Sequence, residues 1–530
     1  MPAPADSQGE ISPVAVNATA APPAPVAVAK RIPGALGRVA VSAAGGLLLF
    51  FAFPPTGWWF CAPIGVALLT VALYGARPRR AAWIGYGGAL AFLIPALSWL
   101  RPIGNDVWFV VAAVEGLFWL AQSIAVALVT RLRRWPVWVA CLWVVQEWLR
   151  GRIPFGGFPW VRLAFSQGES PYTQFAALAG APFVTFMVAL TGTLLSALVI
   201  RLATRRRWDG AIAGTLAAAI AVPVMGLLVP RPVDEGRTVR IGVVQGNVPG
   251  RGMNFLGDEP AVVLRNHADA THRLAQEVRA GRLPRPDLVV WPENSTDIDP
   301  YRNEFARRLI DEAAKDVGVP ILVGAVVNIG TEHRATRGLV WDPVTGPGAY
   351  YDKRKLVPFG EYTPLQDLML AISSRARLVG RQSIAGDTPG ALPMGPVTVG
   401  TVECYEVAFD GVVRDTVNAG GSPLVVQTNN ATYALTVLPP QQLAMSQLRA
   451  VEHNRAVVTA ATTGISAYVH PDGRVLWRTG ELVSAVNVVQ VPVRTATTLA
   501  TRVGALPEWV LILMGAGATA SAGYRARRKN

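Results

Sequence analysis

The stretch Val397-Thr-Val-Gly-Thr-Val-Glu-Cys404-Tyr-Glu406 is an apolar, β-rich run that stops at a reactive side chain. A short apolar run of this kind indicates a buried strand. Proteins of the α/β class build their sites at the carboxyl ends of such strands. Cys404 therefore stands where a thiol nucleophile is expected, although a lone cysteine ending a strand is also typical of a small buried hydrophobic residue.

Two more motifs place a charged side chain just after a strand. Glu293 follows the run Leu288–Trp291, and Lys353 lies in Tyr351-Asp-Lys-Arg-Lys-Leu-Val-Pro-Phe-Gly-Glu-Tyr362. A carboxylate held in an apolar pocket has a raised pKa and can accept the proton of a thiol. The ammonium of Lys353, aided by the backbone N–H of Tyr405, can hold a tetrahedral oxyanion. Together these groups are sufficient for acyl transfer through a thioester.

Each charged residue also has an ordinary structural interpretation. Glu293 could cap a helix, and Lys353, which stands beside two further basic residues, could be solvated surface charge. Spacing along the chain does not show that the three side chains meet.

The three motifs share one stretch, residues 238–495, whose pattern is that of a soluble α/β domain. Helical patterns at 261–280, 302–316 and 440–456 separate apolar runs, which are typical of buried strands. These runs are Val239–Val248, Asp287–Trp291, Ile321–Val327, Val397–Cys404 and Leu424–Thr428. Cys404 is the lone cysteine of this stretch, so the domain cannot contain an internal disulfide.

Apolar segments flank that domain on both sides. Most of them approach the roughly 20 residues that a membrane helix needs. They span residues 36–53, 57–75, 81–100, 105–130, 136–150, 172–200, 209–229 and 505–524. We therefore predict a polytopic α-helical bundle of eight transmembrane helices, seven within 36–230 and the eighth at 503–524. Residues 1–35 are predicted to be a disordered tail, and residues 525–530 a basic tail.

Basic residues lie at every second boundary of these segments. By the positive-inside rule these boundaries are cytoplasmic, which places both termini in the cytoplasm and residues 238–495 outside it. Trp58, Trp59, Trp108 and Trp160 fall near the opposite boundaries, as an interfacial belt would. The basic clusters are Lys30, Arg31 and Arg38; Arg77, Arg79 and Arg80; Arg131, Arg133 and Arg134; Arg201 and Arg205, Arg206 and Arg207; and Arg525, Arg527, Arg528 and Lys529.

The composition excludes several other classes of protein. The net charge of +14 suggests either nucleic acid or an anionic membrane surface as a partner, but the arginines are divided among short clusters between apolar runs. This distribution excludes nucleic acid as the partner and is typical of a membrane protein. The five histidines have no metal-ligand spacing and there is no Gly-rich phosphate loop, so we expect neither a metal nor a cofactor.

Glu293, Lys353 and Cys404, in this order and in these contexts, resemble the Glu-Lys-Cys triad of the nitrilase (carbon–nitrogen hydrolase) superfamily. The apolipoprotein N-acyltransferase branch of that superfamily carries a membrane bundle like the one predicted here. The resemblance covers roughly residues 36–524. Further similar segments are Gln245-Gly-Asn247-Val-Pro, Cys404-Tyr-Glu406, Glu147-Trp-Leu-Arg-Gly and Gly157-Phe-Pro-Trp160.

The resemblance implies a fold and roles for these residues. It implies an αββα sandwich with Glu293 as general base, Lys353 as oxyanion stabiliser and Cys404 as nucleophile. Glu361 and Glu406 fall on the family's supporting carboxylates, although surface or ion-pair carboxylates would look the same.

The implied reaction moves an acyl chain from a membrane phospholipid, through Cys404, onto the N-terminal amine of diacylglyceryl-cysteine in an apolipoprotein. The implied location is the bacterial plasma membrane. Two segments depart from the family pattern, Met253-Asn-Phe255 and Asn429-Asn-Ala-Thr-Tyr433, and both are expected to border the substrate entrance.

Two rival functions remain open on the sequence. A membrane-tethered amidase of the nitrilase type would share the triad and differ only in the acceptor. A transporter would need a polar site among its helices, for which Glu115 is the main candidate. An intramembrane carboxylate is a functional candidate by default, but we favour a structural role for Glu115, paired within the bundle.

Overall fold

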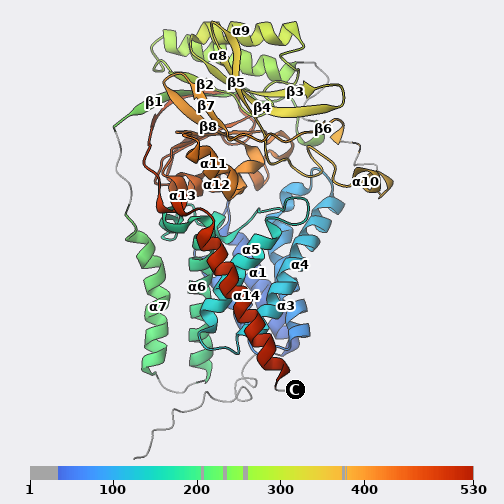
Figure 1. Cartoon of the computed structure of the whole chain (residues 1–530), viewed down its shortest axis with the longest axis vertical. Helices are drawn as coiled ribbons and strands as arrows, with labels where there is room; N and C mark the ends of the chain where they lie inside the picture. The colour runs from blue at the N-terminus through green and yellow to red at the C-terminus, as the bar shows by residue number, and fades with distance from the viewer. Residues whose placement is uncertain are drawn as a thin grey trace, which may run out of the picture.

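A computed structural model describes residues 34–204, 208–230, 236–254, 261–372, 377 and 379–528 of the chain. It consists of a helical bundle with an α/β domain seated on one end (Figure 1). Nearly all of the predicted tail at 1–35, the cluster at 205–207 and Phe255 lie outside the described residues.

A helix stands at each of the eight predicted apolar segments. Four of these helices, α1, α4, α6 with the turn before it, and α7, are long and apolar enough to cross a membrane, and α2 is a shorter apolar helix. The eight are α1 (Ala35–Ala52), α2 (Cys61–Leu73), α3 (Pro78–Ala96), α4 (Asn105–Val129), α5 (Trp135–Arg150), α6 (Ala176–Thr204), α7 (Gly210–Leu227) and α14 (Leu506–Arg527). Helix α14 continues through Arg527, so the first residues of the predicted basic tail at 525–530 are helical.

Small residues allow the helices of the bundle to pack closely. A Cβ atom on Gly46 of α1 would lie 2.1 Å from the carbonyl oxygen of Gly88 in α3, so only glycine fits at this crossing. Ser42 Oγ of α1 also donates a hydrogen bond to the carbonyl of Ile84 in α3, at 2.8 Å. The contact therefore positions α1 against α3.

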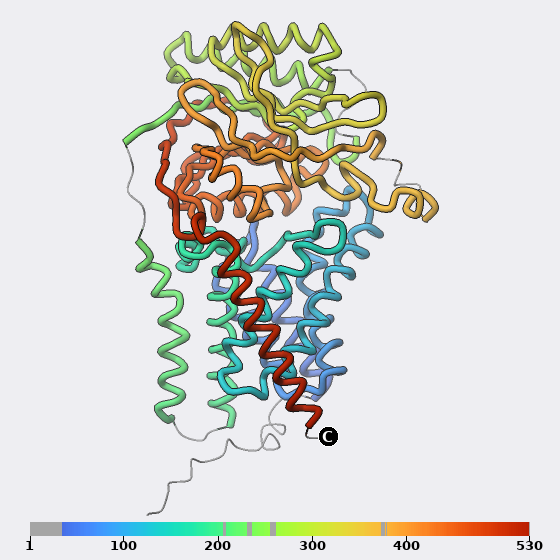
Figure 2. The backbone as a smooth tube through the Cα atoms, in the orientation of Figure 1, coloured from blue at the N-terminus to red at the C-terminus, as the bar shows by residue number. Residues whose placement is uncertain are grey.

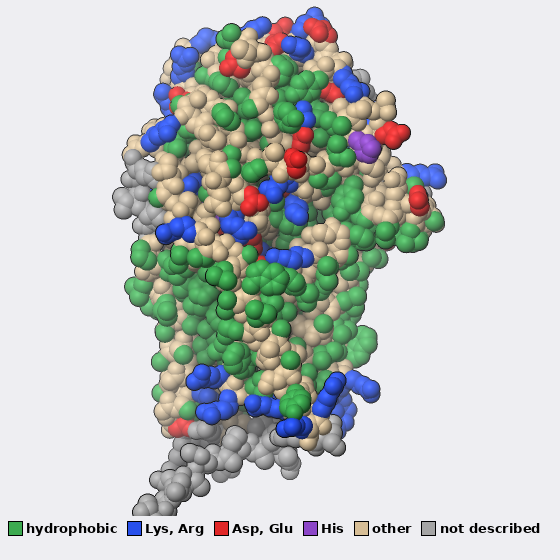
Figure 3. Space-filling view, in the orientation of Figure 1, with side chains coloured by type: hydrophobic (Ala, Val, Ile, Leu, Met, Phe, Trp, Pro, Cys, Tyr) green, Lys and Arg blue, Asp and Glu red, His purple; other side chains and the backbone are tan. Residues whose placement is uncertain are grey.

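The bundle has an apolar flank and one strongly basic end. On the face that Figure 3 shows, hydrophobic side chains cover the flank and Lys and Arg gather at the end away from the α/β domain. Consecutive helices of the bundle alternate in direction, and α2, α4 and α14 all run away from the α/β domain. The described basic clusters that follow α2, follow α4 and end α14 therefore all lie at this end. The predicted alternation of basic boundaries is therefore present in the fold.

The α/β domain contains two sheets that face each other. The first has the order β13 (Ala485–Pro492), β1 (Thr238–Gln245), β2 (Leu288–Val290), β3 (Ile321–Ile329), β4 (His333–Asp342), β5 (Gly346–Asp352), with β6 (Gln382–Ser383) beside β4. The second has the order β12 (Val475–Arg478), β11 (Ala467–Val469), β10 (Val457–Ala461), β9 (Leu424–Thr428), β8 (Val397–Glu403), β7 (Ala391–Met394). Strands β1 to β3 run parallel, as do β8 to β10.

Alternation along the strands builds a four-layer sandwich. Val239, Ile241 and Val243 of β1 face the second sheet, whereas Val244 faces helices α8 (Val262–Arg279) and α9 (Glu304–Val317). Helices α11 (Asp410–Asn418) and α12 (Leu438–His453) cover the second sheet and rest on the bundle (Figure 1). The layers are therefore αββα, as the resemblance implied, with α11 and α12 as the layer next to the bundle.

The chain enters and leaves the α/β domain on the same side (Figure 2). Strand β1, which follows α7, pairs antiparallel with β13, which leads through α13 (Leu499–Val503) into α14. Paired first and last strands close the domain and attach it to the bundle by two adjacent connections.

Candidate active site

Glu293 is held in a tight turn that follows β2. The backbone N–H of Trp291 bonds to the carbonyl of Leu322 in β3. A Cβ atom on Gly324 of that strand would lie 2.0 Å from the Pro292 oxygen and 2.7 Å from Glu293 Cα, so the turn packs directly on bare backbone. Glu293 is 3% exposed and caps no helix, because the next helix, α9, is capped by Asn303.

Lys353 follows the last residue of β5 and is buried. Its Nζ donates to Glu293 Oε1 at 2.8 Å and to Glu361 Oε1 at 2.9 Å. Only 2% of the residue is exposed, so the interpretation as solvated surface charge is wrong. Burial by itself lowers the pKa of Lys353, but the two carboxylates hold that pKa well above its ordinary value. The ammonium is therefore a permanent positive charge in the site.

Cys404 begins a short 3-10 turn, η6 (Cys404–Ala408), directly after β8. Its φ of 48° lies in the left-handed region, which residues with a side chain rarely adopt. Such sharp backbone geometry is common at functional sites. Burial, together with the charge of Glu293, raises the pKa of Cys404 to about 12. At neutral pH the resting sulfur is a thiol and needs a base.

The end of β9 connects the thiol of Cys404 to the carboxylate of Glu293. Thr428 Oγ1 donates to Cys404 Sγ at 3.2 Å, and the backbone N–H of the next residue, Asn429, donates to Glu293 Oε2 at 3.0 Å. The charges of Glu293 and Lys353 both act on the pKa of Cys404. Burial raises the pKa of Glu293, although Lys353 opposes the rise, and a raised pKa makes this carboxylate a stronger base.

Glu361 and Glu406 support different parts of the site. Glu361 Oε1 accepts from Lys353, and its Oε2 accepts from the backbone N–H of Val357 at 2.6 Å. Glu406 Oε1 accepts from the backbone N–H groups of Arg354 at 2.7 Å and Lys355 at 2.9 Å. Glu406 is fully buried and therefore ties the lysine segment to the turn that carries Cys404, whereas Glu361 forms an ion pair with Lys353.

Tyr405 connects the site to the loop that follows α5. Its hydroxyl donates to the carbonyl of Gly157 at 2.9 Å, and its ring stacks on Phe158 and Trp160, each at 6.2 Å between centroids. Trp160 is 2% exposed and donates to Gln441 Oε1 at 2.8 Å. The prediction that Trp160 belongs to an interfacial belt was therefore wrong, because the α/β domain covers it.

Four polar residues around the triad were not predicted from the sequence. Gln442 of α12, Thr428, Asn430 and Glu403 are all buried. Burial, with a further contribution from Glu293, raises the pKa of Glu403 well above its ordinary value. Glu403 stands beside Cys404 in the quoted stretch, and Asn430 lies in the segment Asn429–Tyr433 that was expected to border the substrate entrance, but no motif marks Thr428 or Gln442.

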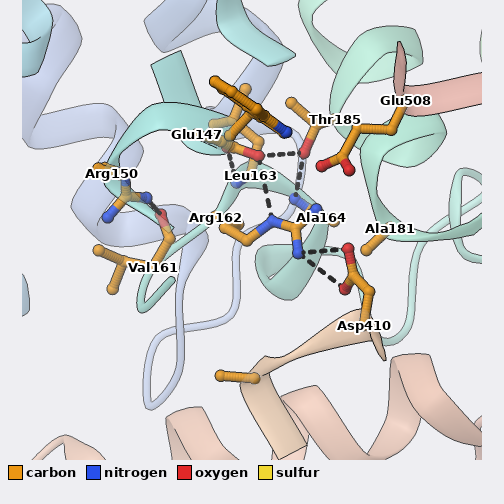
Figure 4. A network of polar contacts seen from close by, with 12 residues as sticks. Glu147, Arg150, Val161, Arg162, Leu163, Ala164, Ala181, Thr185, Asp410 and Glu508 are labelled. Carbon is orange, nitrogen blue, oxygen red and sulfur yellow. Dashed lines mark hydrogen bonds and ion pairs between the residues drawn. The ribbon is translucent and has the colours of Figure 1, made fainter. Parts of the chain in front are cut away.

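A second polar cluster joins the domain to the bundle (Figure 4). Arg162, in the loop after α5, donates to Asp410 at 2.8 and 3.0 Å, and Arg449 of α12 donates to the same carboxylate at 2.7 Å. Burial alone raises the pKa of Asp410, but the two guanidinium groups hold that pKa well below its ordinary value. Glu147 of α5 accepts from the backbone N–H of Leu163 at 2.7 Å, which holds the loop in place.

Glu115 forms an ion pair inside the bundle. Its Oε2 lies 3.3 Å from Nη1 of Arg150, and both side chains are almost fully buried. This pairing favours the structural interpretation of Glu115.

Comparison with known proteins identifies the class of each part of the chain. A carbon–nitrogen hydrolase model matches residues 241–501, and a model of the apolipoprotein N-acyltransferase N-terminal domain matches residues 45–194. The chain thus joins a carbon–nitrogen hydrolase domain to the helical domain of one particular group of membrane proteins.

Whole-chain relatives define that group. The apolipoprotein N-acyltransferase of Mycolicibacterium smegmatis is 38% identical over 508 residues, which are 91% of this chain and 85% of that protein. The apolipoprotein N-acyltransferase of Azotobacter vinelandii is 29% identical, over 86% of this chain and 89% of its own. The chain belongs to the apolipoprotein N-acyltransferase family. Among solved structures, an amidase of the nitrilase superfamily from Nesterenkonia is 20% identical, with a TM-score of 0.36 over 48% of this chain and 90% of its own.

Proposed function

We propose that this chain transfers an acyl chain from a membrane phospholipid, through a thioester on Cys404, to the N-terminal amine of diacylglyceryl-cysteine in an apolipoprotein. The observation that carries the proposal is the convergence of a buried carboxylate, a buried ammonium and a thiol on the bundle side of a carbon–nitrogen hydrolase domain. The family relationship over the whole chain supports the same acceptor.

In the first half-reaction Glu293 acts as the base. It takes the proton of Cys404, and the thiolate attacks the ester carbonyl of the phospholipid. Lys353 and the backbone N–H of Tyr405 hold the oxyanion of the tetrahedral intermediate. The carbon–oxygen bond then breaks, Glu293 returns its proton to the departing oxygen, and lysophospholipid leaves.

In the second half-reaction the amine of diacylglyceryl-cysteine attacks the thioester. Glu293 takes a proton from the attacking nitrogen, the carbon–sulfur bond breaks, and its electron pair remains on Cys404. An amide is formed, and the proton on Glu293 passes back to the sulfur. The lysine–carboxylate pairs keep their positions through both halves, so the oxyanion site is already organised before substrate arrives.

We also propose that all eight helices of the bundle cross the plasma membrane of a bacterium. Both termini would then lie in the cytoplasm and the α/β domain outside it. The basic clusters at the end of the bundle away from that domain support this orientation. Donor and acceptor both reside in the bilayer, which gives a physical reason for tethering the domain there.

Exposed apolar side chains near the site support a lipid substrate. Phe359, beside the lysine segment, contacts Phe155 of the bundle loop, with 6.1 Å between ring centroids. Helix α10 (Gln366–Ile372) carries exposed Leu368 and Ile372 and projects from the domain beside the bundle (Figure 1). An apolar rim at the junction of domain and bundle suits acyl chains that approach from the bilayer.

The amidase alternative shares the triad but leaves the bundle unexplained. The model of the acyltransferase N-terminal domain matches residues 45–194, so the helical part also belongs to this family. Nothing in the described site favours water or a small amide over a lipid-anchored amine.

Intact-protein mass spectrometry tests the proposal. The purified chain, incubated with vesicles of a phospholipid of known acyl composition, should gain the mass of one acyl group and lose it when a diacylglyceryl-cysteine peptide is added. Cys404→Ala should gain no acyl group. Cys141→Ala, which removes a buried bundle cysteine, should behave as the parent. Acylation of the Cys404→Ala protein, or hydrolysis in place of transfer to the peptide, would contradict the proposal.

A further inference from the structure

The hydroxyl of Thr428 has one hydrogen and two acceptors. Its Oγ1 lies 3.2 Å from Cys404 Sγ and 2.9 Å from Gln442 Oε1. A hydroxyl can donate to only one of them at a time. Thr428 is 1% exposed and Gln442 2% exposed, so the hydroxyl and its amide acceptor are both shielded from bulk water.

Asn430 fixes which way the amide of Gln442 faces. The Nδ2 of Asn430 donates to Gln442 Oε1 at 3.0 Å and to Thr428 Oγ1 at 3.3 Å. Because Oε1 is thereby an acceptor, the amide nitrogen of Gln442 points at the sulfur, with Nε2 lying 3.5 Å from Cys404 Sγ. The nucleophile therefore faces two potential donors, one of which has an alternative acceptor close by.

We propose that Thr428 and Gln442 donate hydrogen bonds to the thiolate of Cys404, and that the Thr428 hydroxyl turns between sulfur and Gln442 Oε1 as the charge on sulfur appears and disappears. A thiolate is a strong acceptor and a thioester sulfur is a poor one. The two acceptors of the hydroxyl thus match the two states of the sulfur. This assignment adds two catalytic residues to the proposed acyltransferase reaction, on which it rests.

The hydroxyl acts each time an electron pair comes to rest on the sulfur. When Cys404 loses its proton to Glu293, Thr428 donates to the new thiolate. When the thiolate becomes a thioester, the hydroxyl turns to Gln442 Oε1. When the amine has attacked and the carbon–sulfur bond breaks, the electron pair returns to sulfur and the hydroxyl turns back, while Glu293 holds the proton from nitrogen. No co-reactant beyond the two substrates is needed.

Alkylation of Cys404 by iodoacetamide measures the thiolate without any lipid substrate. At one pH near 8, the full-length protein in detergent should react more slowly after Thr428→Val, which exchanges the hydroxyl for a methyl group of similar size. A hydrogen bond to a charged group changes an equilibrium about 10- to 100-fold. Weaker bonding also makes the remaining thiolate more nucleophilic, so the expected fall in alkylation rate is about 3- to 10-fold.

Three further variants separate hydrogen bonding from packing. Thr428→Ser keeps the hydroxyl and should restore the rate to within about 3-fold of the parent, a margin below the loss of one such bond. Gln442→Met keeps the length of the side chain without the amide and should also slow alkylation. Thr416→Val makes the same change at a buried hydroxyl of α11 that has no partner among the described residues, and its rate should equal that of the parent.

The transfer step gives a second readout. On acyl-enzyme formed beforehand, transfer to a diacylglyceryl-cysteine peptide should slow about 10- to 100-fold in Thr428→Val, because the leaving thiolate loses a donor. A parent that never becomes acylated would overturn the proposed function and leave the alkylation test standing. Parent-like alkylation of Thr428→Val, or failure of Thr428→Ser to restore the rate, would overturn the role of the hydroxyl.

Discussion

At the scale of single residues, the site concentrates charge where water is scarce. Lys353 faces two carboxylates, Glu293 and Glu361, and all three are largely buried. Removing one member of a buried ionic group leaves an uncompensated charge, which costs more than the loss of an exposed pair. The cluster therefore has to be complete for the fold to hold the proposed base and the proposed oxyanion donor in the same pocket.

Replacing Lys353 with Met should remove the charged oxyanion donor and leave the thiol in place. Loss of one such donor usually lowers a rate about 100- to 1000-fold, and acyl-enzyme formation should fall by that range.

Glu293→Gln keeps the shape of the side chain but removes the proposed base, so acyl-enzyme formation should slow at least about 100-fold. Pre-steady-state acylation from labelled phospholipid, on variants matched for membrane expression, measures both. Parent-like acylation in either variant would remove that residue from the mechanism.

At the scale of elements, Asp410 attaches the turn of the nucleophile to the bundle. It begins α11, six positions after Cys404, and receives Arg162 from the bundle loop and Arg449 from α12. Arg162 lies 248 positions from Asp410 in the sequence, and Arg449 lies 39 positions from it. One carboxylate thus fixes three segments that no local pattern relates to each other.

Asp410→Asn should destabilise the protein, because two buried guanidinium groups would each lose one of their carboxylate partners. Arg162 would keep Glu147, and Arg449 would keep Glu452. The expected loss is on the order of 3 kcal/mol, as for removal of one partner of a buried ion pair. Asp415→Asn on the same helix breaks a more exposed pair with Arg354 and should cost less than about 1 kcal/mol. Thermal unfolding in detergent compares the two. Equal unfolding temperatures for both variants would show that the Asp410 cluster does not secure the junction.

At the scale of the whole molecule, the bundle and the sandwich differ in the kind of surface that they expose. The bundle exposes hydrophobic side chains on its flank, and the sandwich keeps its apolar residues between and beneath its sheets. The turn that carries Cys404 lies against the bundle loop, because Tyr405 donates to the carbonyl of Gly157. In the topology proposed above, this contact places the turn on the membrane side of the domain.

Single cysteines introduced on the two ends should report opposite sides of the membrane. Glu332→Cys, in the exposed turn between β3 and β4, should react with a membrane-impermeant maleimide on intact cells. Arg133→Cys, in the exposed turn between α4 and α5, should react only after the membrane is permeabilised. The parent, with its own three cysteines, gives the background. Labelling of both positions from the same side would refute the orientation proposed here.

Stability of the α/β domain should fall as the pH drops below neutral. Burial lowers the pKa of His267 from 6.5 to about 4, so the folded state keeps this ring neutral while the unfolded state takes up a proton. A depressed histidine pKa stabilises the fold above pH 6.5, and that contribution is lost between pH 6.5 and about 4. This difference between the two pKa values corresponds to about 3 kcal/mol in the free energy of unfolding.

Unfolding in urea at pH 7 and pH 5 measures this effect. His267→Leu should show a smaller difference between the two pH values than the parent, and some difference should remain because burial also lowers the pKa of His453 to about 4. His333→Gln, at an exposed position of β4, should keep the full difference. An unchanged pH dependence in His267→Leu would show that this ring does not titrate as its burial implies.

Local patterns predicted the eight helices of the bundle, five strands and three helices of the α/β domain, and the positions of the proposed site residues. Strand ends marked Glu293, Lys353 and Cys404, and apolar length marked the eight helices, because strand and helix periodicity are written in neighbouring residues. The sandwich followed from the resemblance. The strands β4, β6, β7 and β10 to β13 were not predicted, and the strand before Lys353 was predicted without bounds, since several of these strands are short or only half apolar.

Only the tertiary structure decided how these positions are used. It buried Lys353 between two carboxylates, placed Trp160 under the α/β domain, and brought Thr428 and Gln442 to the sulfur of Cys404. These contacts join segments that lie far apart in the sequence, and a hydrogen bond depends on a few tenths of an ångström between them. The sequence alone determined which side chains could react and which segments prefer lipid. The packing of distant segments decided which charges face each other without water, and that decides the chemistry.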